Sequence, residues 1–415
     1  MARYILSDID GFNDIIKCDD NNNSQILKLN KIEGESSLRA SHNSYKIIRY
    51  DKNFLSFDLV HSYGLCRSVI INRYNIVVGF SPPKSIQSDE FIKKYNEPID
   101  EVIAEEFVEG TMINVFWDNS IGLFGGWEIA TRNTVGAASS FYKGDGAKTF
   151  KDMFLEAMRE TNLVIDNLDK EYSYSFVLQH PENRIVVPFN KPDLYLVAVY
   201  KIHNTTDNII VNSYHSSEYK CFFSQIKTSV KFPKVYNFTK YSDLIEKYAS
   251  MNTSYNIVGV VIYNKVTGER TKIRNPVYEQ VRNLRGNQPK LQYQYLSLRN
   301  EGRVKDFLKF YPEYKNNFSK FRDQVHLFTN TLFSNYIKCY VKKEKPLKEF
   351  TEQYRTHMFN IHKIFLNELR ENNHFVTNNV VKKYVNEIHP SLLMYCLNLQ
   401  MRKRVIDTIF AENTM

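Results

Sequence analysis

The chain has 415 residues, 43% hydrophobic and 24% charged, which is the composition of a globular protein. Its 15 glycines and 12 prolines are too few for a collagen-like or proline-rich architecture. Lysine and arginine (55) outnumber aspartate and glutamate (46), and the formal net charge of +9 favours a polyanionic partner. The length predicts two or three domains.

The cysteines and the hydropathy pattern indicate the cellular compartment. Five cysteines lie far apart without a CxxC pair, which argues against a disulfide framework or zinc ribbon and favours a reducing compartment. Asp8 and Asp10 interrupt the start of the chain before a signal-like apolar stretch forms. The sequence contains no run of about 18 apolar residues, the length that a membrane-spanning helix needs. The sequence therefore predicts a cytoplasmic, intracellular protein with no membrane partner.

Short runs rich in Val, Ile, Phe and Tyr, bounded by turn residues, dominate residues 45–263 and are typical of strands. Helices are expected at Thr149–Thr161 and Tyr241–Ser250. Strands interspersed with helices predict an α+β fold built on antiparallel sheets. The expected strands are Ser68–Asn72, Asn75–Phe80, Met112–Trp117, Tyr174–Leu178, Arg184–Val187, Leu194–Tyr200 and Ile257–Tyr263.

The pattern changes after about Leu296, where phenylalanines recur at roughly helical spacing among Lys, Arg and Asn. This pattern predicts an all-helical region with breaks near Pro312, Pro346 and Pro390. The expected domains are an N-terminal segment (1–44) that packs on the main domain, the main domain itself (45–295) and a helical C-terminal domain (296–415).

A set of short segments carries the functional signal through the order in which the segments occur. Each segment alone is weak, but their order and spacing together are moderately specific. The segments are CRSVII (66–71), FSPPKS (80–85), EFVEGT (106–111), EIATR (128–132), HPENRIV (180–186), VGVVI (258–262) and TKIR (271–274).

Taken in this order, the segments resemble the adenylylating domain of phage-type RNA ligase 1, a branch of the covalent nucleotidyltransferases. The resemblance covers about residues 45–275, and FSPPKS looks like the matching segment of a giant-virus subgroup, which implies a viral protein acting in the host cytoplasm. In that family a lysine attacks the α-phosphate of ATP, the AMP passes to an RNA 5′-phosphate, and a 3′-hydroxyl displaces it. The resemblance thus implies ATP, Mg²⁺ and RNA ends.

Matching the segments residue by residue gives the implied nucleotide site. Lys272 and Arg274 fall on the final Lys-x-Lys pair of the family, and their i, i+2 spacing on a strand directs both to one face, as a phosphate clamp requires. The implied nucleotide- and phosphate-binding residues are Arg67, Lys84, Glu109, Gly110, Arg132, Lys272 and Arg274.

Three other positions depart from the family. Phe107 stands where the nucleophilic lysine is expected, and a phenylalanine cannot form a phosphoramidate. Val177 and Val258 stand where the family has carboxylates, so no metal ligand is assigned. No lysine adjoins Phe107, which leaves Lys84 as the surrogate nucleophile to consider.

A basic and aromatic stretch follows the last matched segment, between Arg282 and Arg303. Basic groups that alternate with stackable rings are typical of a single-stranded RNA path, which would use Arg282, Arg285, Tyr293 and Tyr295. A polar hinge between two domains, with the tyrosines in the interface, explains the same residues equally well.

Two functions therefore stay open. The order of the segments favours an RNA ligase-like enzyme that acts on RNA ends with ATP and Mg²⁺. The lost lysine and carboxylates favour a catalytically inactive module that binds RNA ends, a cap or a nucleotide.

Overall fold

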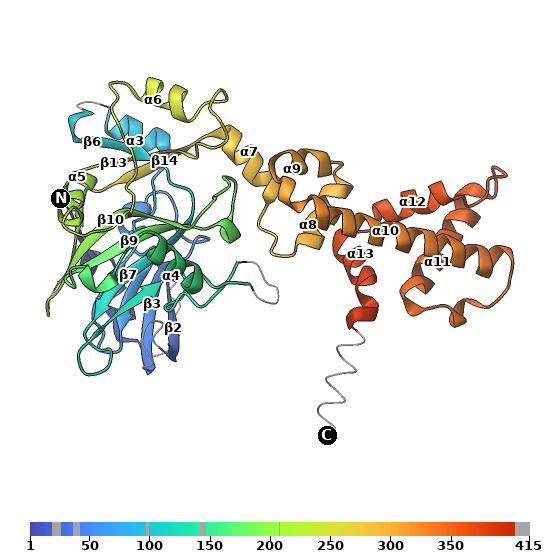
Figure 1. The fold of residues 1–415 in the computed structure, drawn as a ribbon, viewed down its shortest axis with the longest axis horizontal. Coiled ribbons are helices and arrows are strands. Elements are labelled where there is room, and N and C mark those ends of the chain that lie inside the picture. Colours follow the sequence, from blue (N-terminus) through green and yellow to red (C-terminus); the bar gives the residue numbers. More distant parts are fainter. Residues whose placement is uncertain (19–25, 36–41, 97–98, 142–146, 207, 403–415) are drawn as a thin grey trace. The chain divides into compact units, whose positions relative to one another are not determined.

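The computed structural model describes residues 1–18, 26–35, 42–96, 99–141, 147–206 and 208–402. The chain forms two compact units, Met1–Arg282 and Asn283–Met415. Figure 1 shows that strands dominate the first unit and helices the second. The predicted α+β class, with antiparallel sheets followed by a helical region, is confirmed. The expected domain limits at 44 and 295 stay a prediction.

The described residues of the first unit form three sheets, and every strand pairing among them is antiparallel. The six-stranded sheet has the order β1 (Ala2–Ile5), β11 (Ile209–Tyr214), β10 (Asp193–Asn204), β9 (Tyr172–Gln179), β7 (Thr111–Asp118) and β8 (Gly126–Ala130). The second sheet has the order β2 (Leu27–Glu35), β3 (His42–Tyr50), β4 (Val69–Asn72) and β5 (Val77–Phe80). The third has the order β12 (Val235–Tyr236), β6 (Val102–Glu106), β13 (Gly259–Asn264) and β14 (Arg270–Arg274).

Helices cover the six-stranded and the third sheet through apolar faces. α4 (Phe150–Glu160) begins at a capping box in which Thr149 and Asp152 satisfy each other's backbone N–H groups. Its Phe154 packs with Phe176 of β9 in the core of the six-stranded sheet. On the third sheet, α3 (Ser88–Lys94) and α6 (Tyr241–Tyr248) bury their apolar side chains against β6 and β13. The other helices of this unit are the short α1 (Phe12–Lys17), α2 (Val60–Tyr63) and α5 (Ser216–Phe223).

One expected strand is absent: residues 184–187 form a bend. The prediction was wrong because the backbone N–H groups of this segment have a different partner. Val186 and Val187 donate to the carboxylate of Glu109 at 2.9–3.2 Å instead of to a neighbouring strand. A β-rich sequence therefore forms a loop here, since a buried carboxylate satisfies its backbone.

The second unit is helical, as the phenylalanine spacing predicts. Buried aromatic side chains form much of its interior, among them Phe307, Phe318 and Phe328. Proline marks helix limits where expected: α9 stops at Phe310 before Pro312, and Pro390 is the first residue of α13. The helices are α7 (Pro276–Arg285, which runs across the division), α8 (Leu291–Asn300), α9 (Val304–Phe310), α10 (Lys315–Tyr336), α11 (Glu352–Ile364), α12 (Asn378–Glu387) and α13 (Pro390–Leu397). Among the described residues, no helix combines the length and apolar character needed to cross a bilayer.

Candidate functional site

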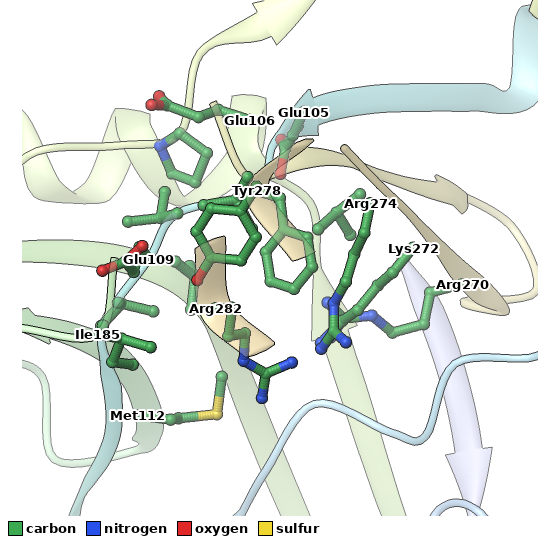
Figure 2. A pocket seen from close by; sticks show the side chains of 18 of the residues that line it. Glu105, Glu106, Glu109, Met112, Ile185, Arg270, Lys272, Arg274, Tyr278 and Arg282 are labelled. Carbon is green, nitrogen blue, oxygen red and sulfur yellow. The ribbon is translucent and has the colours of Figure 1, made fainter. Parts of the chain in front are cut away.

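A pocket of about 250 Å³ opens in the first unit where the third sheet meets the six-stranded sheet. The ends of β6, β13 and β14 form one side, and β7 and β9 contribute to the other. The first turns of α7 close it with Tyr278 and Arg282. Figure 2 shows the nitrogens of Arg270, Lys272 and Arg274 gathered on one side and Glu109 on the opposite side.

The cationic side of the pocket is built by the alternation of β14. Arg270, Lys272 and Arg274 line the pocket, while Thr271 between them is fully buried and donates to the Ile86 carbonyl at 3.0 Å. Arg67, which precedes β4, joins them from another part of the chain. Because successive side chains of a strand point to opposite faces, β14 directs three basic side chains to one surface.

The positive charge of this cluster is largely uncompensated. Arg274 pairs with Glu279 at 3.2 Å. Arg67, Arg270 and Lys272 form no ion pair with a carboxylate in the part of the chain that the structure describes. Cations held together without counter-charge repel one another, so such a cluster fits an anionic ligand.

The cluster lowers the proton affinity of its own members. Burial, followed by the charges of the neighbouring Arg270, Arg67 and Arg274, lowers the pKa of Lys272 to about 6. Burial is also the main cause that lowers the pKa of Arg67 to about 10, followed by the charges of Arg270 and Arg132. Lys272 is therefore an amine that is mostly unprotonated at neutral pH.

Phe107 forms an apolar wall beside these cations. Its ring centre lies 4.8 Å from the Lys272 amine and 5.6 Å from the Arg274 guanidinium carbon. Its backbone N–H donates to the Gly259 carbonyl at 3.2 Å, which fixes the end of β6 on β13. Val177 and Val258 line the same pocket. Phe107, Val177 and Val258, the three residues at which the sequence differs from the motifs it resembles, thus line one pocket and present apolar surfaces to it.

Glu109 and Gly110 have structural roles at the opposite side. The buried Glu109 carboxylate accepts the N–H groups of Val186 and Val187. Burial raises its pKa, although those hydrogen bonds favour the charged form. Gly110 has a φ of 149°, and a Cβ there would lie 2.4 Å from the Leu178 carbonyl oxygen. Both residues line the pocket, yet their local contacts shape its wall.

Two further acidic residues line the pocket from β6. Glu105 is buried and accepts a hydrogen bond from the Tyr263 hydroxyl at 3.0 Å, and burial raises its pKa. Glu106 is partly exposed and accepts the Lys234 N–H at 3.3 Å. Within the described ranges, no group of three or more His, Cys, Asp and Glu side chains is arranged to hold a metal ion.

A second pocket of about 450 Å³ shares Glu106, Phe107 and Glu109 with the first. Aromatic rings line it, among them Tyr236 and Tyr248, whose rings stack at 4.0 Å. Gln179 and Asn256 add polar side chains. Phe107 therefore stands between a cationic pocket and an aromatic one.

Lys84 and Arg132 lie near the cluster but do not line the pocket. Burial lowers the pKa of Lys84, and Arg67, Arg132 and Lys52 lower it further, so these cations share one electrostatic field. The Arg132 guanidinium stacks over the Tyr50 ring at 5.3 Å. Both residues extend the positive field beyond the pocket.

The four residues expected on an RNA path are divided between the two units. Arg282 lines the pocket and pairs with Glu279 at 3.3 Å. Arg285 is only 3% exposed and lies over the Tyr314 ring at 5.4 Å. Tyr295 is 4% exposed and packs against Phe318, whereas Tyr293 on the same helix is partly exposed. The positions of Arg285 and Tyr295 favour a packing role.

Sequence reasoning missed Arg270, Tyr278 and the two β6 glutamates as pocket residues. The signal for Arg270 was present, since it precedes Lys272 by two residues and follows the same alternation. Tyr278 carried no comparable signal, because α7 brings it to the pocket only after the chain has turned at Asn275.

No protein-family model matches the chain, but two curated proteins have similar sequences. The chain is 25% identical over 269 residues to an RNA ligase of Rhodothermus phage RM378, which covers 58% of this chain and 57% of the relative. It is 26% identical over 315 residues to the Immediate-early protein ICP-46 homolog of Invertebrate iridescent virus 6, and this match covers 69% of this chain and 65% of the relative. It therefore spans less than two thirds of the length of each relative.

Among solved structures, two variants of Naegleria gruberi RNA ligase, each with ATP and Mn, match with a TM-score of 0.36. The first is 11% identical and covers 49% of this chain and 58% of that chain; the second is 12% identical and covers 48% and 57%. The sequence relatives show that this chain is RNA ligase-like over part of its length and that it has viral homologues.

Proposed function

We propose that the cationic pocket binds the phosphates of a nucleotide and of an RNA end, and that the protein acts on RNA ends as an ATP-dependent, RNA ligase-like enzyme. The observation that carries this proposal is the cluster of Arg67 and Arg270 beside Lys272, because these two arginines form no ion pair with a carboxylate among the described residues. The similarity to a phage RNA ligase supports the same substrate class. The viral relatives support a viral protein in the host cytoplasm.

The residues present fit a nucleoside triphosphate. The cations would neutralise the phosphates, and the adjoining ring-lined pocket offers surfaces on which a base can stack. Mg²⁺ commonly binds through substrate phosphates, waters and one or two carboxylates. Glu106 is the partly exposed carboxylate that would complete such a shell and so offset the charge of the phosphates.

A second function is favoured by the apolar side of the pocket. Phe107, Val177 and Val258 supply neither a nucleophile nor a metal ligand. A protein with this wall would bind RNA ends, a cap or a nucleotide without chemistry.

Binding of short RNAs that differ only at the 5′ end tests the proposal. Filter binding should show tighter binding of 5′-phosphorylated RNA than of the 5′-hydroxyl form, and ATP should compete with the former. Lys240→Gln removes an exposed cation outside the pocket and should not change either result. Equal affinity for the two RNAs, with no competition by ATP, would overturn the proposal. Formation of a joined RNA product with ATP and Mg²⁺ separates the enzyme from the non-catalytic module.

A further inference from the structure

The amine of Lys272 is set apart from the other cations of the pocket by its surroundings. Its charged neighbours are all of one sign: Arg270, Arg67 and Arg274. Its nearest ring is Phe107, whose face attracts an ammonium group only weakly and accepts no conventional hydrogen bond from it. The acidic residues of the pocket have other partners: Glu105 accepts from Tyr263, Glu106 from the Lys234 N–H, and Glu109 from the backbone at 186–187.

This environment favours an uncharged amine. A lysine used only as a phosphate contact needs its positive charge, whereas a nucleophilic lysine needs a free electron pair. Desolvation and adjacent cations are the two devices that free that pair, and both act on Lys272, whose pKa lies at about 6. The arginines retain their charge at neutral pH and remain available for the phosphates.

The Lys272 amine lies beside position 107, where the family resemblance implies a lysine and this chain has Phe107. The amine lies 4.8 Å from the ring that occupies the place of the expected nucleophile, so it reaches the same part of the pocket from β14 instead of from β6. Lys84, the surrogate that the sequence suggests, does not line the pocket.

We propose that Lys272 is the covalent acceptor of the pocket and forms a phosphoramidate with the α-phosphate of a nucleoside triphosphate. The unprotonated amine attacks the α-phosphorus, a nitrogen–phosphorus bond forms, and the bond to the bridging oxygen of the β-phosphate breaks. Pyrophosphate leaves with the electron pair of that bond, and the nitrogen releases one proton to solvent. Arg67, Arg270 and Arg274 stabilise the charge on the transferred and leaving phosphates.

The inference rests on the proposed nucleotide binding, and one experiment separates the two. The protein is incubated with Mg²⁺ and ATP labelled at the α-phosphate, denatured and separated by electrophoresis, while ATP binding is measured on the same preparation. The wild type should carry label that survives alkali and is lost in acid, as a phosphorus–nitrogen bond requires. Mass spectrometry of an alkaline digest should locate the nucleotide on the peptide that contains Lys272.

Three variants make the assignment specific. Lys272→Arg keeps the positive charge but cannot present an unprotonated amine, so labelling should fall at least 100-fold. The control Lys240→Arg, on the surface away from the pocket, should label as the wild type does. Label that persists in Lys272→Arg, or that disappears only in Lys84→Arg, would overturn the inference.

The remaining outcomes are also decisive. ATP binding without any label in the wild type refutes Lys272 as acceptor and leaves the proposed binding function standing. Absence of both binding and label refutes the proposed function itself. Competitive acetylation with acetic anhydride provides a readout that needs no catalysis: Lys272 should gain reactivity around pH 6 and be protected by ATP. A rise in reactivity only near pH 10 would contradict the inference.

Discussion

In the first unit, Lys272 and Arg274 lie over the ring of Phe107 at the side of an open pocket. In the second unit, Arg285 lies over the ring of Tyr314 and is only 3% exposed. Both regions place a basic side chain over an aromatic ring. They differ in what surrounds the pair, since β14 directs its basic side chains to a pocket while the helices enclose Arg285. Composition alone therefore does not distinguish a binding surface from an interior.

The largest effect is expected from Tyr295, whose ring packs against Phe318 and Phe321 in the second unit. Tyr295→Ala should lower the free energy of unfolding of this unit by about 3–5 kcal/mol, because it removes a buried ring and leaves a cavity. Denaturant unfolding followed by circular dichroism measures the change. Tyr293→Ala, on the same helix but partly exposed, is the control and should have a smaller effect. Unchanged stability with weakened RNA binding would assign Tyr295 to an RNA path.

The next effect concerns ligand affinity. Arg270→Gln should raise the Kd for ATP and for 5′-phosphorylated RNA roughly 10–100-fold, because a charge-assisted contact contributes about 1.5–3 kcal/mol. Titration calorimetry under conditions where both variants are folded measures it. Arg285→Gln should leave the Kd unchanged, since the side chain is enclosed. Equal losses in the two variants would mean that burial does not separate the two regions.

A third prediction concerns pH and stability. Between about pH 6 and 10.4 the unfolded state holds the proton of Lys272 and the folded state does not. The unfolded state thus binds more protons, and the stability of the wild type should rise with pH in this window. Lys272→Met should lose that dependence, which amounts to at most about 1.4 kcal/mol per pH unit.

The measurement is a series of urea unfolding curves from pH 6 to 10 on wild type and Lys272→Met. At pH 7 the variant should be the more stable of the two, and the difference should shrink toward pH 10. Parallel pH dependences would show that the Lys272 amine is protonated in the folded protein.

The smallest effect distinguishes two arginines of α7. Arg282 lines the pocket and Arg285, three residues later, is buried. Filter binding of single-stranded RNA across a salt series should give a slope that is flatter by about 0.7 in Arg282→Gln, because one phosphate contact is lost. Arg285→Gln should keep the wild-type slope. A change of equal size in both would place both side chains on the RNA.

Local patterns predicted much of the fold. The expected helix at 149–161 is α4, and the expected strand at 112–117 lies within β7. The strand prediction for 184–187 failed because the β-rich composition gave no sign that Glu109, 77 residues before Val186, would accept the N–H groups of this segment. A partner so distant in sequence leaves no trace in a local window.

The pocket was predictable to the extent that it depends on strand alternation. Residues 270, 272 and 274 share one face because successive side chains of a strand point to opposite sides, and this holds in any fold that makes the segment a strand. Everything else was decided by tertiary structure. The pairing of β13 with β6 and β14 brings Phe107 within 4.8 Å of Lys272, although 165 positions separate them. Helix packing encloses Arg285 while Arg282, on the same helix, stays at the pocket. Burial and proximity are properties of packed surfaces, and the desolvation that frees the Lys272 amine arises only when those surfaces meet.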